Sequence, residues 1–151
     1  MTEIITMLIG SAFGSLGFSV MFNALPKRLP FLAVGGLLTC GTYLIFAHYL
    51  GGEFLPNLIA TVVAGIYAEI LARIIKAPVI VIIIPSIVPL VPGAGLYYTL
   101  FNFINKDYTV CVDKLFSTFM ICLGIAGGMV ISSILGSMIK KPPLIIKHKK
   151  A

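Results

Sequence analysis

The sequence contains few charged residues and no tryptophan. Lys and Arg number 11 and Asp and Glu number 5 among 151 residues, whereas hydrophobic residues make up 59% of the chain. Soluble domains carry roughly a quarter of charged residues, so this composition excludes an ordinary water-soluble domain. The mean hydropathy of +1.08 predicts an integral membrane protein, with no room left for a nucleotide-binding module.

Residues that carry catalysis or bind metals are also scarce. The two histidines are isolated, with His48 at the end of an apolar run and His148 among lysines. The three cysteines, Cys40, Cys111 and Cys122, show no CxxC spacing, and the chain has neither an HExxH motif nor a phosphate-binding loop. We therefore expect no enzymatic activity, no disulfide framework, no metal site and no cofactor.

Long apolar runs occupy almost the whole chain. Each exceeds the roughly 20 residues that a helix needs to cross the hydrocarbon core, and short alternating segments typical of a membrane β-barrel are missing. The sequence predicts an all-α integral membrane protein with five transmembrane helices in a single domain of residues 1–151. The predicted spans cover residues 4–26, 29–50, 54–75, 77–105 and 115–139, followed by a basic tail at 140–151.

The lysines and arginines alternate between the two sides of this predicted bundle. Lys106 and Lys114 lie in the fourth loop, and all others lie in the first loop, around the third loop and in the tail. By the positive-inside rule this pattern predicts an N-terminus outside, a C-terminus inside and a fourth span that crosses the membrane. The net charge of +6 then needs no nucleic-acid partner, because the tail can lie on anionic lipid headgroups.

The fourth span is interrupted by prolines. Pro85, Pro89 and Pro92 fall within a run that has no charged residue. Proline removes a backbone donor and clashes with the preceding turn, so the run cannot form one regular helix. We expect a discontinuous helix with two halves, residues 78–88 and 94–104, and a break near the membrane midplane. A helix that is only kinked, with neighbours satisfying its free backbone groups, is the alternative.

A break of this kind is the usual construction of a transporter's binding site. The second half-helix would direct its free N–H groups and its positive dipole end to the membrane centre, which suits a carboxylate. Tyr97 and Tyr98 lie one turn further and either fix a polar substrate or serve as packing aromatics. The candidate site residues are Pro85, Pro89, Pro92, Gly93, Ala94, Gly95, Tyr97 and Tyr98.

Glu69 is the acidic residue that lies inside an apolar stretch, and Arg73 follows four residues later. This spacing places both side chains on one helix face, where they can pair. Because ionisable groups within spans are costly, they point to a function such as proton coupling or gating. A structural ion pair near the cytoplasmic end is the alternative.

Small residues recur at four-residue intervals in the first and last spans. Such stripes allow helix backbones to approach closely, either within one chain or between subunits, or they line a pore. The two stripes consist of Gly10, Ser11, Gly14 and Ser15, and of Gly124, Gly128, Ser132 and Gly136.

The stretch Ala68–Arg73, followed by Ala77-Pro78 and then by Pro85-x3-Pro89-Leu-Val-Pro-Gly-Ala-Gly95-x-Tyr97, resembles the threonine/serine exporter family of bacterial membrane proteins. The similarity is to the small, C-terminal-type unit, which in this family occurs fused to a larger unit or as a separate subunit. It implies export of threonine and serine, or of succinate in a split pair, and location in the bacterial cytoplasmic (inner) membrane. It also implies a larger complementary exporter subunit as partner, because one half alone cannot enclose a substrate path.

Three kinds of function remain open on the sequence. The first is a subunit of a secondary exporter for small carboxylate substrates, driven by a gradient since no ATPase motif is present. The second is a homo-oligomeric channel, with Glu69 at its mouth. The third is a membrane scaffold that transports nothing itself.

Overall fold

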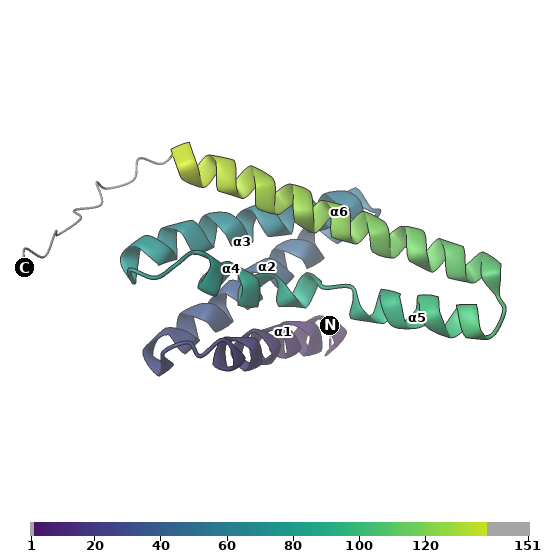
Figure 1. Ribbon diagram of the computed structural model, residues 1–151, viewed down its shortest axis with the longest axis horizontal. Helices are drawn as coiled ribbons and strands as arrows, with labels where there is room; N and C mark the ends of the chain where they lie inside the picture. The colour runs from purple at the N-terminus through teal and green to yellow at the C-terminus, as the bar shows by residue number, and fades with distance from the viewer. Residues whose placement is uncertain (1, 139–151) are drawn as a thin grey trace, which may run out of the picture.

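The computed structural model describes residues 2–138, which form helices joined by short turns (Figure 1). Ile139 and the tail predicted at 140–151 lie outside the described residues. The described part contains no β-strand, so the all-helical fold is confirmed. Its elements are α1 (Thr2–Met21), η1 (Pro26–Arg28), α2 (Leu29–Leu50), α3 (Phe54–Ile74), α4 (Ile80–Ile87), η2 (Val88–Leu90), α5 (Gly93–Ile104) and α6 (Tyr108–Met138).

Four helices, α1, α2, α3 and α6, are long and apolar enough to cross a membrane. A fifth candidate is a bent pair in which the segment Ile80–Leu90 meets α5 at an angle of 49°. In Figure 1, α5 and the adjoining part of α6 form a hairpin that extends beyond α1–α4. The structure thus has four candidate membrane-spanning segments, or five if the bent pair forms one span.

The helices approach one another through glycine and serine. A methyl group added to Gly36 of α2 would collide with Ser15 of α1, and one added to Gly65 of α3 would collide with Ser132 of α6. Without a hydrophobic driving force between helices in lipid, close backbone packing of this kind holds them together. A buried apolar cluster around Leu32 joins α2, α3 and α4.

The glycine stripe of α6 packs within the chain. A methyl group on Gly124 would lie 2.6 Å from the carbonyl oxygen of Phe54, and one on Gly128 would lie 2.7 Å from that of Leu58. Both carbonyls belong to the N-terminal half of α3. This stripe therefore serves packing within the chain, which is one of the three interpretations that the sequence left open. The pair of α3 and α6 is the most extensive helix contact of the bundle.

The basic loops lie at one end of the bundle. Arg28 Nη2 donates a hydrogen bond of 3.2 Å to the carbonyl oxygen of Ile75, which joins the first loop to the third. The loop at Gly51–Glu53 lies at the opposite end of α2, a helix of 22 residues. The structure agrees with the charge pattern in grouping these loops, and the side of the membrane on which they lie stays a prediction.

The start of the last span differs from the sequence prediction. The charged residues 106–114 were expected to form a loop before a helix at 115, but α6 begins at Tyr108 and runs for 31 residues. Only a short turn separates α5 from α6, with Lys106 at a φ of 61°. The prediction was wrong here because charge marks unfavourable contact with lipid, not the end of a helix. At 1.5 Å per residue α6 is about 46 Å long, more than the hydrocarbon core of roughly 30 Å.

Candidate functional site at the α4–α5 break

The interruption between α4 and α5 is shorter than the predicted stretch from Pro89 to Gly95. Pro85 lies inside α4 and Pro89 inside η2, and only Val91 and Pro92 separate η2 from α5. Proline is tolerated at the first turn of a helix because the missing N–H would be unsatisfied there anyway, and Pro89 takes this position in η2. The helix also resumes at Gly93, one residue earlier than expected.

A tight turn at Pro92 sets the direction of α5. Pro92 has a φ of −80° and a ψ of 58°, the geometry of an inverse γ-turn, and Gly93 N donates to Val91 O at 2.8 Å. The regular hydrogen bonds of α5 begin with Leu96 N, which donates to Pro92 O at 3.1 Å. Within residues 2–138, the N–H groups of Ala94 and Gly95 have no hydrogen-bond partner. They carry the positive end of the α5 dipole.

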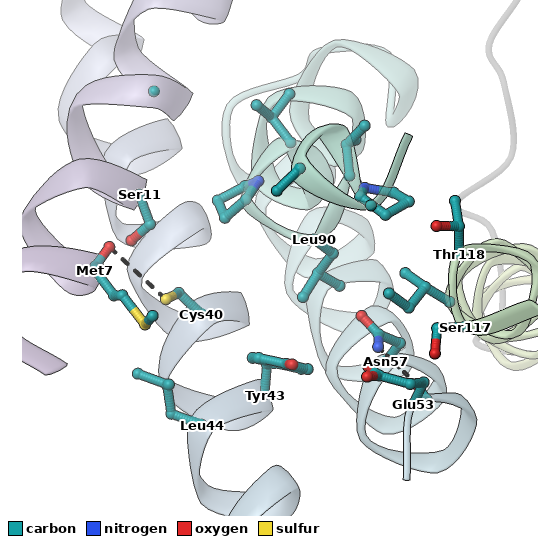
Figure 2. A pocket seen from close by; sticks show the side chains of 18 of the residues that line it. Met7, Ser11, Cys40, Tyr43, Leu44, Glu53, Asn57, Leu90, Ser117 and Thr118 are labelled. Carbon is teal, nitrogen blue, oxygen red and sulfur yellow. Dashed lines mark hydrogen bonds between the residues drawn. The ribbon is translucent and has the colours of Figure 1, made fainter. Parts of the chain in front are cut away.

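These N–H groups belong to residues that line a cavity of about 650 Å³. The volume lies in the range typical of small-molecule sites. All the long helices contribute to its wall, as Figure 2 shows. Its polar and charged lining residues are Ser11, Cys40, Tyr43, Glu53, Asn57, Tyr98, Lys114, Ser117 and Thr118.

Asn57 is the most deeply buried polar side chain of this wall, with an exposed fraction of 2%. Its Nδ2 donates to the carbonyl oxygen of Glu53 at 2.6 Å, whereas its Oδ1 accepts no hydrogen bond from any residue that the structure describes. In Figure 2 this oxygen points away from Glu53 and toward Leu90. Oδ1 is not fully enclosed by protein atoms, and Asn57 lines the cavity, so this oxygen can accept a hydrogen bond from a ligand.

Two charged side chains lie at the same cavity. Glu53 is half-buried in the turn before α3, and Lys114 is exposed on α6. Neither side chain forms an ion pair within residues 2–138, where the ion pair within 4.0 Å joins Glu69 to Arg73. The cavity thus offers one negative group and one positive group that do not neutralise each other.

The structure brings together some of the predicted site residues. Pro89, Pro92, Ala94, Gly95 and Tyr98 line the cavity, while Pro85, Gly93 and Tyr97 are not part of its wall. Whether any of them binds a substrate stays a prediction.

Glu69 and Arg73 lie elsewhere. Their side chains pair at 3.3 Å, as the spacing of four residues predicted, and Arg73 Nη2 also donates to Gly136 O at 3.0 Å. Glu69 lines a second cavity of about 240 Å³ together with Ser132 and other residues of α3, α4 and α6. The pair therefore links α3 to the C-terminal end of α6, and its part in coupling or gating stays a prediction.

Sequence reasoning missed Asn57, Glu53 and Lys114. A signal for Asn57 was present, since it is the asparagine of the apolar segment 54–75 and polar residues within spans tend to have a function. Glu53 and Lys114 were treated only as loop charges. Residues 2–138 contain no group of three or more potential metal ligands.

The fold and the site define a class: a multi-pass membrane protein with a mainly apolar cavity that carries a few polar groups at a helix break, which is the architecture of a transporter. The sequence matches the family described as threonine/serine exporter, ThrE, over residues 7–135. The chain therefore belongs to the threonine/serine exporter family, and the resemblance noted in its proline-rich motif is confirmed. No solved structure matches the chain.

Proposed function

We propose that this chain is a subunit of a secondary exporter that moves threonine, serine or another small polar carboxylate, such as succinate, across the bacterial cytoplasmic membrane. The observation that supports this most is the cavity at the α4–α5 break, which combines free backbone donors with a buried polar side chain. The class of exporter follows from the family. The substrate and the subunit arrangement are our proposal.

The wall of the cavity suits the groups of a hydroxy amino acid. The N–H groups of Ala94 and Gly95 can donate to a carboxylate, and helix N-termini favour such anions. Lys114 adds a positive charge at the same cavity. Asn57 Oδ1 can accept a hydrogen bond from a hydroxyl group, which a threonine or serine side chain provides. An apolar ligand would leave these polar groups unsatisfied.

The proposed larger partner would complete the wall of this cavity. Gly10 and Gly14 of α1 line the cavity, and a methyl group added to either would meet no atom within 4 Å. The α5 helix packs mainly against α6 and exposes apolar side chains. The exposed residues of α5 are Leu96, Tyr97, Tyr98, Leu100, Phe101, Phe103 and Ile104. A five-helix partner of inverted topology packed here would form a transporter of two halves with the site at their interface.

The predicted orientation of the chain indicates to which side of the membrane this cavity opens. With the N-terminus outside, the loop at Gly51–Glu53 faces the exterior, and the linked basic loops at Arg28 and Ile75 face the cytoplasm. The cavity residues Glu53 and Met7 lie near the outer ends of α3 and α1. We infer an outward-facing arrangement in which the Arg73 link to Gly136 holds the cytoplasmic ends of α3 and α6 together.

Efflux from preloaded cells tests the proposal. Cells expressing the chain with and without a larger subunit of the same family would be loaded with labelled threonine, serine or succinate, at matched membrane abundance. Saturable efflux that requires both subunits is the expected result. An unsaturated, voltage-dependent current from the chain alone would instead establish a channel. Efflux that is the same with and without the chain would indicate a scaffold that transports nothing itself.

A further inference from the structure

The opposite charges of Glu53 and Lys114 at one cavity bear on the choice of substrate. A dicarboxylate such as succinate carries two negative charges, whereas an amino acid carries one carboxylate and one ammonium group. A site that holds one cation and one uncompensated anion matches the amino acid. It also places a like charge near any second carboxylate.

The structure fixes the position of Glu53 from both sides. Gly51 and Gly52 precede it with φ angles of 62° and 69°, a left-handed conformation that glycine adopts without strain. On its other side, Asn57 Nδ2 holds the carbonyl oxygen of Glu53 at 2.6 Å. The backbone at Glu53 is therefore held at the start of α3, and from there its side chain lines the cavity.

We propose that Glu53 determines substrate specificity: its carboxylate pairs with the ammonium group of an amino acid and repels the second carboxylate of a dicarboxylate. This inference rests on the proposed function, because it assumes that the cavity binds the transported molecule. Specificity commonly combines such attraction to one ligand with repulsion of another. Lys114 and the N–H groups of α5 serve the carboxylate that both kinds of substrate share.

The first experiment measures serine and succinate efflux by the chain with its larger partner. We expect wild-type protein to prefer serine at least tenfold, and Glu53→Gln to reduce this preference about tenfold or more. Glu53→Asp keeps the charge and should keep the preference. Lys114→Gln should lower the efflux of both serine and succinate and leave the ratio of the two efflux rates unchanged.

The matched control is Asp113→Asn. Asp113 is an exposed acidic residue beside Lys114 that does not line the cavity, so its neutralisation should leave both efflux rates and their ratio unchanged. A ratio that shifts equally in Asp113→Asn and Glu53→Gln would overturn the proposal in favour of a general surface-charge effect.

A second measurement uses wild-type protein and does not depend on the folding of any variant. Glycerate has the size of serine but carries a hydroxyl in place of the ammonium group. It should inhibit serine efflux at least tenfold more weakly than unlabelled serine does. Equal inhibition by glycerate, or an unchanged substrate ratio in Glu53→Gln, would overturn the role of Glu53 and leave the exporter intact. Absence of saturable efflux of either substrate would overturn the proposed function and this inference with it.

Discussion

Replacement of Gly124 by alanine tests how the packing of α6 positions the cavity. The added methyl group would lie 2.6 Å from Phe54 O and 3.2 Å from Asn57 Cβ. Both are on the α3 backbone or next to it, so neither can rotate away as the end of a long side chain would. Gly127 provides the matched control three residues later, since a methyl group there would meet the Leu58 side chain at 3.6 Å, an ordinary contact.

The two substitutions share the same gain in helix propensity, so their difference isolates the cost of overpacking. That cost is typically about 1–3 kcal/mol, and we expect Gly124→Ala to be less stable than Gly127→Ala by this amount. Denaturant unfolding of the purified proteins in detergent measures it. Efflux should also fall in Gly124→Ala alone, because the shift displaces Asn57 in the cavity wall. Equal stability of the two variants would refute the close α3–α6 contact on which the geometry of the site depends.

Three further predictions concern the site and the topology. Asn57→Leu should lower serine efflux about tenfold or more, measured in cells at matched membrane abundance. The control Asn102→Leu loses a similar hydrogen bond to the carbonyl four residues earlier but lies outside the cavity, so its efflux should not fall. Arg73→Met should cost about 1–2 kcal/mol in the free energy of unfolding, because it removes a charged hydrogen bond to the α6 backbone, and Arg73→Lys should recover part of it. Single cysteines at Leu50 and Lys27 should react with an impermeant maleimide from opposite sides, Leu50→Cys from outside intact cells and Lys27→Cys only after permeabilisation; the reverse result would contradict the predicted orientation.

The sequence predicts the helical class and the place of the break from local chemistry. Prolines at 85, 89 and 92 limit where a helix can be continuous, and glycine after Pro92 permits the chain to restart at once. The exact extent of the break could not be read from the residues, because Pro85 and Pro89 are accommodated inside helical turns. Whether a helix accommodates a proline depends on how the backbone of the preceding turn avoids the proline ring, and this is a property of the folded chain.

Most of the cavity wall could not be predicted at all. Asn57 and Thr118 are separated by many residues in sequence and line the same cavity because glycines of α6 let α3 and α6 approach closely. The i, i+4 pairing of Glu69 with Arg73 was predictable because it is local, but the bond from Arg73 to Gly136 O joins two helices. Contacts within one helix follow from periodicity, while contacts between helices depend on which small residues face each other.

Substrate protection of a single cysteine in the cavity tests the central claim most directly. In a chain with its native cysteines replaced by alanine, Ser117→Cys places a thiol in the cavity wall on α6, and Ser137→Cys places one on the exposed far end of the same helix. The account predicts that saturating serine slows maleimide modification at position 117 at least severalfold and leaves the rate at position 137 unchanged, and that modification at 117 abolishes efflux. Equal modification rates with and without substrate, together with full efflux after modification at 117, would show that the transported molecule does not use the cavity at the α4–α5 break.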